Sequence, residues 1–304
     1  MSDSVAIQTR RYGFRAMGTD VTLLAGADVE DRSFESAAVK VRRIFVREEL
    51  RFSRFRGDSE LSTVNASAGR PTRVSPGFAE LLAFAIDAAH RTRGRFDPTV
   101  LGAVVAAGYD RDFDEVLAGA RAALRPTMPC GRFAQIAVHG DEVLLPSDVG
   151  LDLGGVAKGW TVDLAAESVT AAYLPWAVVN AGGDLRITGE VPAPGIEVGV
   201  EDPECRGEDV ARLVLGEGAI ATSSTTRRAW GPGLHHLIDP ATGLPAANGV
   251  LQATVWAPTC AEAEVLAKEV LLDGQTALDR VGAVLVTADG RIVTNIEGAT
   301  EVAA

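Results

Sequence analysis

The stretch Gly150–Trp160, GLDLGGVAKGW, lies in the middle of the chain between a strand-like approach and a predicted helix. Gly154 and Gly155 leave backbone N–H groups uncovered at the start of that helix, where the helix dipole favours an anion. Lys158 could add a point charge to a phosphate, and Asp152 could accept a hydrogen bond from a ribose, an adenine amine or a flavin N–H. Neither GxxxxGK[ST] nor GxGxxG is present, so a glycine-rich turn with a surface lysine stays equally open on spacing alone.

Composition limits the classes of function. The chain has 304 residues, 47% of them hydrophobic and 23% charged, with a formal net charge of −12 and no cluster of Lys and Arg. We therefore expect no nucleic-acid partner. No signal peptide is visible and no run reaches ~18 apolar residues, so we expect no membrane insertion. Three widely spaced cysteines without zinc spacing favour a reduced, cytoplasmic location.

The hydrophobic pattern predicts an α+β fold with mostly antiparallel sheets and interspersed helices. Ser75-Pro76 is typical of a helix start, and Asp289-Gly290 of a tight hairpin turn. The predicted strands are 21–24, 177–179, 185–189, 219–223, 235–239 and 250–257, the predicted hairpins 133–145 and 283–295, and the predicted helices 34–50, 76 to near 94, 160–174 and 261 to about 272.

Three other polar clusters could carry chemistry, and each has a structural alternative. NAGGD, residues 180–184, could be a plain turn that needs glycine at positive φ. In HHLID, His235 and His236 point to opposite faces if extended, so one of them should face a pocket; a structural histidine is equally compatible. Glu264 and Lys268 are four residues apart on a predicted helix, and spacing alone favours a surface ion pair.

Taken together and in order, the motifs resemble the FAD:protein FMN transferase (ApbE-like) family over nearly the whole chain. The stretches that carry the resemblance are AMGTDVTL (16–23), FSRFRGDSELSTVN (52–65), GRFDPTVLG (94–102), LDLGGVAKGWTVD (151–163), VVNAGGDLRITG (178–189), AIATSSTTRR (219–228), HHLIDPATGLP (235–245) and the helix after Cys260. The resemblance implies one domain over 1–304, with two intertwined lobes and a ligand cleft between them. It also implies binding of FAD, metal-assisted cleavage of its pyrophosphate, transfer of FMN to a threonine or serine of a target flavoprotein, and release of AMP.

The resemblance also assigns site residues. His236 would be the catalytic base that activates the acceptor hydroxyl, and the carbonyl of Gly155 and the carboxylate of Glu264 would bind Mg²⁺. Phe55 stands where the family often has a tyrosine, so it keeps a stacking ring without the hydroxyl. The implied FAD-binding residues are Met17, Phe55, Arg95, Phe96, Asp97, Asp152, Lys158 and Ile238, with Arg95, Phe96 and Asp97 acting through backbone groups.

The sequence departs from the family at the metal motif, where Lys268 stands at the position of a metal-binding threonine. An ammonium has only donors and repels a cation. This suggests the hypothesis that Lys268, held by Glu264, replaces the magnesium ion. Two alternatives to the transferase stay open: a flavin-binding protein without transfer, and a hydrolase that splits FAD into FMN and AMP.

Overall fold

An eight-stranded sheet forms the centre of the computed structural model, which describes residues 7–119, 130–297 and 299–302. The strand order is β1-β2-β6-β7-β10-β15-β16-β17, and every paired strand in the described part of the chain is antiparallel. The bounds are β1 Thr9–Ala16, β2 Thr19–Gly26, β6 Trp176–Ala181, β7 Asp184–Gly189, β10 Gly218–Ser224, β15 Val250–Ala257, β16 Ala283–Thr287 and β17 Ile292–Thr294.

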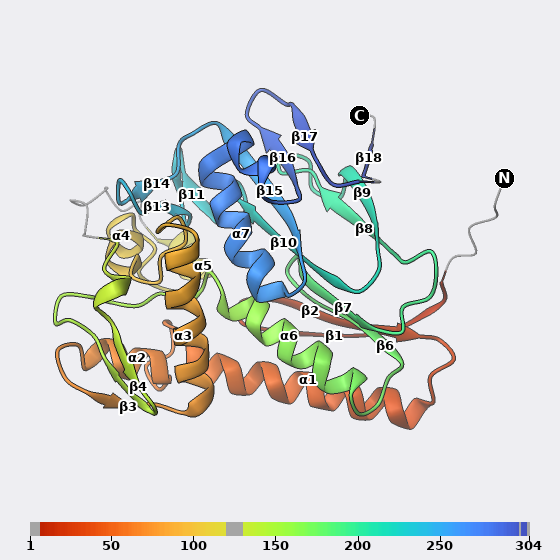
Figure 1. Ribbon diagram of the computed structural model, residues 1–304, viewed down its shortest axis with the longest axis horizontal. Coiled ribbons are helices and arrows are strands. Elements are labelled where there is room, and N and C mark those ends of the chain that lie inside the picture. Colours follow the sequence, from red (N-terminus) through yellow and green to blue (C-terminus); the bar gives the residue numbers. More distant parts are fainter. Residues whose placement is uncertain (1–6, 120–129, 298, 303–304) are drawn as a thin grey trace.

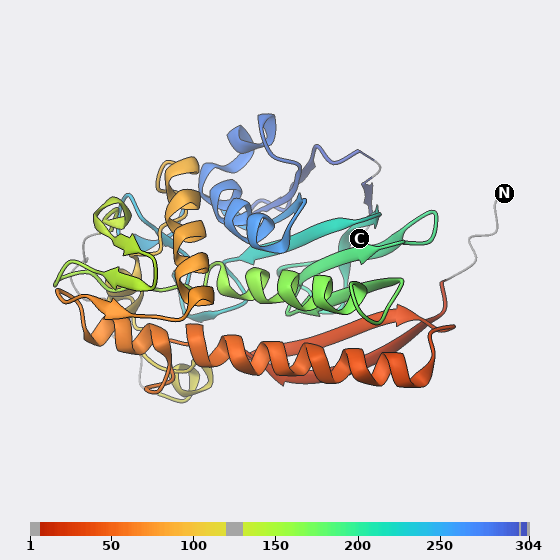
Figure 2. The same cartoon turned by 60° about the horizontal axis from the view of Figure 1, so that its bottom comes forward.

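Three helices cover one face of this sheet: α1 (Asp31–Phe52), α6 (Ala157–Thr170) and α7 (Cys260–Asp273). Figure 1 shows α6 and α7 in front of the sheet, and Figure 2 shows α1 running along β1 and β2. Buried alanines and valines of these helices pack against the apolar side chains of β2 and β6, because alternate strand residues face the same side. The opposite face packs on a small sheet of β8 (Ile196–Glu201), β9 (Asp209–Leu215) and β18 (Thr300–Glu301).

A second unit, the small lobe, contains α2 (Glu60–Ala66), α3 (Pro76–Arg91), α4 (Leu101–Ala106) and a sheet of β3 (Thr72–Arg73), β4 (Ala137–His139) and β5 (Glu142–Leu144). Apolar residues of α2, α3 and β5 form its core together with Leu151 and Leu153.

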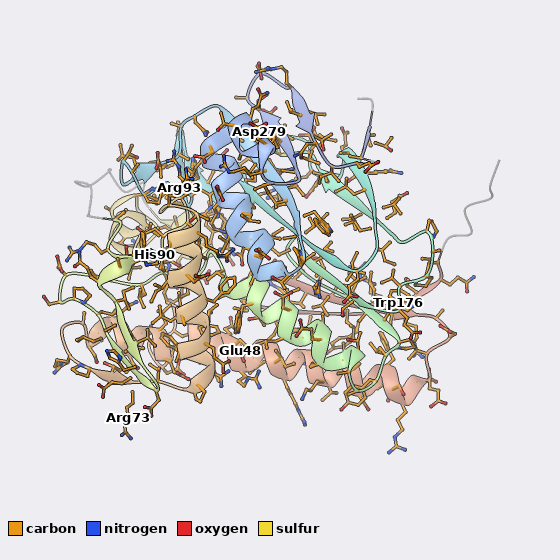
Figure 3. The ribbon with its side chains drawn as sticks, viewed as in Figure 1. Glu48, Arg73, His90, Arg93, Trp176 and Asp279 are labelled. Carbon is orange, nitrogen blue, oxygen red and sulfur yellow. The ribbon has the colours of Figure 1, made fainter. Side chains whose placement is uncertain are left out.

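The last turns of α1 reach the small lobe. Phe52 is buried in the core of that lobe, and the fully buried Glu48, labelled in Figure 3, pairs with Arg51 at 2.8 Å. The remaining elements are α5 (Phe113–Ala118), the 3₁₀ helices Phe133–Gln135 and Gly274–Asp279, and the short hairpins β11 (Ala229–Gly231) with β12 (Leu234–His235) and β13 (Ile238–Asp239) with β14 (Leu244–Pro245).

The predicted α+β class and antiparallel pairing are confirmed. The Ser75 hydroxyl accepts the N–H of Phe78 at the start of α3, as its capping role predicts. The single strand predicted over 235–239 is wrong: the chain breaks after His235, because the N–H of Leu237 turns to His235 Nδ1 at 3.3 Å. The predicted hairpin 133–145 is also shorter, since its first residues form a 3₁₀ helix. No helix in the described part of the chain is long and apolar enough to cross a membrane.

Candidate active site

One cavity of about 1460 Å³ collects chain segments from both the main sheet and the small lobe. It is lined by the β1–β2 turn, the end of α1, the loop before α6 (residues 152–155), the segments after β10 and β12, and one side of α7. Every residue predicted for the site lies along it: Met17, Phe55, Arg95, Phe96, Asp97, Asp152, Gly155, Lys158, His236, Ile238, Glu264 and Lys268.

Helices α6 and α7 meet at very close range, and this contact positions the charged end of the cavity. A Cβ placed on Gly159 would lie 2.5 Å from the carbonyl oxygen of Cys260, so only glycine allows this approach. Asp163 on α6 accepts the N–H groups of Cys260 (2.8 Å) and Ala261 (2.9 Å) at the start of α7. In return, the N–H of Gly159 donates to Glu264 Oε2 at 2.9 Å. The two helices are therefore fixed to each other in both directions.

Two ammonium groups meet at Glu264. Lys158 Nζ lies 3.4 Å from Glu264 Oε1 and also bonds to Asp184 Oδ2. Lys268 Nζ donates to the backbone carbonyl of Glu264 at 3.0 Å and lies 3.8 Å from its Oε1. We call Lys158, Lys268, Glu264 and Asp184 the lysine cluster. The surface ion pair suggested by the spacing of Glu264 and Lys268 is wrong, because Glu264 is buried and Lys268 is mostly covered.

Burial and the neighbouring charges shift the pKa values of Glu264 and Lys268. Burial alone would raise the pKa of Glu264, but the charges of Lys158 and Lys268 outweigh it, so the pKa is lowered and the carboxylate stays ionised. Burial lowers the pKa of Lys268 to about 8, against the opposing charge of Glu264. Asp184, whose Oδ1 accepts the N–H of Thr222 at 3.2 Å, is itself almost fully buried and fixes Lys158 from behind the cavity wall.

The two adjacent histidines have different surroundings. His235 is buried, with Nε2 3.0 Å from the carbonyl oxygen of Ala246, whereas His236 lines the cavity. The backbone N–H of His236 donates to the carbonyl of Arg228 at 3.2 Å, and its Nδ1 is buried without a hydrogen-bond partner among the described residues. Burial, with the charges of Arg228 and Lys268, holds the pKa of His236 well below its usual range, so the imidazole is neutral at neutral pH.

An arginine and two aromatic rings form another wall. Asp152 accepts from the Gly154 N–H at 2.7 Å, and its other oxygen lies 3.1 Å from Arg54 Nε. The Arg54 guanidinium lies over the rings of Phe55 (4.1 Å) and Tyr109 (4.4 Å). Its Nη2 is buried without a partner among the described residues. Phe55 keeps 39% of its surface exposed, so one side of this wall is open to a flat ligand.

The other predicted residues lie along the cavity, and their side chains mostly contact the protein itself. The Asp97 carboxylate accepts from Thr99 and from the N–H of Gly131, so its side chain is already satisfied. Arg95 pairs with Asp273 at 2.7 Å. Phe96 and Ile238 are buried. Met17 has a φ of +50° in the β1–β2 turn, and its N–H donates to Glu49 Oε1 at 3.0 Å.

Comparison with known proteins identifies the family. The model of the ApbE family matches residues 17–284. The chain belongs to the ApbE family. Two curated relatives named FAD:protein FMN transferase, from Rhodobacter capsulatus and Treponema pallidum, are each 31% identical to it. The matches cover 78% and 76% of this chain, and 48% and 70% of the respective relatives, so the chain spans about half the length of the first.

Solved ApbE structures share the fold. The ApbE protein of Thermotoga maritima superposes with a TM-score of 0.80 at 24% identity, over 95% of this chain and 97% of that one. The flavin transferase ApbE of Vibrio cholerae gives a TM-score of 0.79 at 24% identity over the same shares.

The residues at the position where the resemblance implies Mg²⁺ do not suit that ion. A Cβ on Gly155 would lie 2.6 Å from Lys268 Cε and 3.4 Å from its Nζ, so the lysine side chain fills the space beside the predicted carbonyl ligand. Two ammonium groups already surround Glu264, the one carboxylate of the predicted metal set. The described residues hold no group of three or more His, Cys, Asp or Glu side chains that could bind a metal ion.

No individual role was predicted from the sequence for Arg54, Tyr109, Arg228 or Asp184, although Asp184 ends the NAGGD stretch singled out above. Asp184 directly follows the two glycines of NAGGD, and an acid in that place was a usable signal. Arg54 gave no such signal, because its partner Asp152 belongs to a distant segment and only the fold brings the two together.

Proposed function

We propose that this ApbE-family chain binds FAD in the cavity and transfers the FMN moiety to a threonine or serine hydroxyl of a target flavoprotein, releasing AMP. The observation that carries the proposal is the meeting of a neutral histidine, His236, and two ammonium groups, Lys158 and Lys268, on one cavity. A hydroxyl needs a base to become a good nucleophile, and a pyrophosphate needs positive charge where its own charge develops.

The transfer is a single displacement at the phosphorus of the FMN phosphate. The acceptor oxygen attacks the phosphorus of the FMN phosphate and forms a new P–O bond, while the P–O bond to the AMP phosphate breaks. His236 takes the hydroxyl proton on its ring, which is neutral at the start because burial holds its pKa well below the usual range. Lys158 and Lys268 provide the positive charge for this step, because the residues at the predicted metal position do not suit Mg²⁺.

The remaining residues bind and orient FAD in this proposal. Lys158 donates to the phosphate oxygens. Asp152 accepts a hydrogen bond from a polar edge of the cofactor, beside the open face of Phe55. Met17, Arg95, Phe96, Asp97 and Ile238 complete the pocket wall. Because both lobes contribute to one cavity, we infer that the chain acts as one unit.

The decisive experiment compares His236→Asn with wild type and with the exposed-histidine control His139→Asn. FAD binding is followed by quenching of flavin fluorescence, and AMP by chromatography. We expect His236→Asn to bind FAD normally and to lose AMP release by about 10²-fold or more, whereas His139→Asn keeps both. Full AMP release by His236→Asn would contradict the role of the histidine.

The same assay separates the two alternatives. Free FMN in amounts equal to AMP would indicate the hydrolase, and FAD binding without AMP would indicate a binding protein. Flavin fluorescence that stays on a protein band of the source-cell lysate in a denaturing gel would support the transferase. We also propose a cytoplasmic location, which the cysteine usage favours and which fractionation of source cells tests.

A further inference from the structure

Lysine is rare in this chain and concentrated at one point. Lysines and arginines together number 29, but only three are lysines: Lys40, Lys158 and Lys268. Lys40 is exposed on α1, whereas the other two meet at the buried Glu264. Two of three lysines at one carboxylate, in a chain that uses arginine elsewhere, indicate a site that needs compact ammonium charges.

The geometry holds these two ammonium groups in place before any ligand arrives. Lys158 is bonded to Asp184 and lies 3.4 Å from Glu264, and Lys268 bonds to the Glu264 carbonyl at 3.0 Å. Both lysine side chains keep 18% of their surface exposed, and both lie along the cavity. Each ammonium has three donors, so donors remain available for phosphate oxygens.

We propose that the lysine cluster is a metal-free pyrophosphate site, in which Lys158 and Lys268 together supply the positive charge that a divalent cation would otherwise bring. The inference rests on the proposed function and adds to it that FAD binding and AMP release need no divalent metal. The two ammonium groups together carry the charge of one divalent ion, and Glu264 and Asp184 balance them as carboxylate ligands balance a bound metal. Such fixed charges need no reorganisation when the phosphates arrive. A cation entering between them would meet two like charges within a few ångströms.

The first test uses the unmodified protein, stripped of metal with EDTA. We expect FAD binding and the rate of AMP release in excess EDTA to lie within about twofold of those in excess MgCl₂. We also expect Mn²⁺, followed by electron paramagnetic resonance, to stay free in solution when added to the FAD-bound protein. A fall of about tenfold or more in EDTA, or tight Mn²⁺ binding, would overturn the inference.

The second test installs oxygen ligands with the double variant Glu264→Asp/Lys268→Thr. We expect this variant to bind Mn²⁺ and its AMP release to become EDTA-sensitive by about tenfold or more. The matched control is Lys40→Thr, which removes the third lysine and should behave like wild type in both assays. Circular dichroism checks the fold of each variant, and the comparison on wild type decides the question where the double variant does not fold.

The two proposals fail in different ways. AMP release that requires Mg²⁺ would overturn the metal-free site and leave the transferase standing. FAD binding without AMP under either condition, with Mn²⁺ bound by the double variant and not by wild type, would support the site and overturn the transferase.

Discussion

Asp163 and Glu264 are two buried carboxylates on one pair of packed helices, and their pKa values are shifted in opposite directions. Asp163 on α6 accepts two N–H groups from α7, and Glu264 on α7 accepts one from α6. Burial raises the pKa of Asp163 to about 6, against the backbone donors and Arg186, whereas the pKa of Glu264 is lowered despite burial. The two acids therefore share a hydrogen-bonding role, but their pKa values shift in opposite directions.

The difference comes from the cations around each acid. Among the residues that the structure describes, the cation paired with Asp163 is Arg186, at 3.7 Å, and the nearby carboxylate of Glu167 acts against it by raising the pKa of Asp163. Glu264 has the ammonium groups of Lys158 and Lys268 within 4 Å. The Asp163 end of the helix contact therefore joins the two helices, whereas the Glu264 end holds two ammonium groups at the cavity. Packing buries both acids, and the nearby cations decide whether burial or opposite charge sets the direction of the pKa shift.

The largest effect is expected from breaking the lysine cluster with Glu264→Gln. The amide keeps the size and can still accept from Gly159, but it removes the counter-charge that two mostly covered ammonium groups share and leaves only Lys158 with a second one, Asp184. We expect the free energy of unfolding to fall by about 3–5 kcal/mol, measured by urea denaturation near pH 7. A loss below about 1 kcal/mol would mean that the cluster is solvated and that the contrast with Asp163 is not electrostatic.

The next effect is a pH dependence of opposite sign at the two acids. The pKa of Asp163 is raised from 3.8 to about 6, so its contribution to stability is present below pH 3.8 and is lost as the pH rises to about 6. Glu264 has a lowered pKa, so its contribution is present above its ordinary value of 4.5 and is lost as the pH falls.

Urea unfolding between pH 4 and 7 measures this contrast on wild type, Asp163→Asn and Glu264→Gln. We expect the stability difference between wild type and Asp163→Asn to decrease with rising pH, by up to about 3 kcal/mol. The difference between wild type and Glu264→Gln should instead increase with pH. Slopes of the same sign would show that the two acids feel the same environment.

Gly159→Ala tests the close approach on which both acids depend. The new methyl group would meet the Cys260 carbonyl at 2.5 Å, so α6 and α7 must separate. We expect a loss of about 1–3 kcal/mol in thermal or urea unfolding. The control is Gly216→Ala, where a Cβ meets nothing within 4 Å, and it should change stability little. Equal effects of the two substitutions would rule out the helix contact as the cause.

The sequence predicted the local elements because their signals are local. The Ser75-Pro76 helix start, the hairpin turn at Asp289-Gly290 and the strand 250–257 each follow from a few adjacent residues. Strands β1, β8 and β9 were not predicted, although β1 and β8 alternate between more and less covered residues, which is the pattern of a strand with one covered face.

The candidate site was predicted through the resemblance and not through spacing. Spacing gave Glu264 and Lys268 as a surface pair, because helix periodicity cannot tell which side of a helix a neighbouring element covers. Their burial depends on α6, which Gly159 brings against α7. The roles of Lys158 and Asp184 in the same cluster follow only from the fold, which joins the start of α6 to the start of β7.

The smallest effect is expected at Glu262, two residues before Glu264 on the same helix. Its side chain is 31% exposed and pairs with the partly exposed Arg91 at 3.2 Å. Water screens such a pair, so Glu262→Gln should cost less than about 1 kcal/mol and leave FAD binding unchanged. Urea unfolding at low and high salt checks this, because the small contribution of an exposed pair should vanish as salt increases. A cost equal to that of Glu264→Gln would mean that any charge removed from α7 destabilises the protein. A much larger cost for Glu264→Gln than for Glu262→Gln would attribute the effect to the burial of Glu264 and to its two lysine partners.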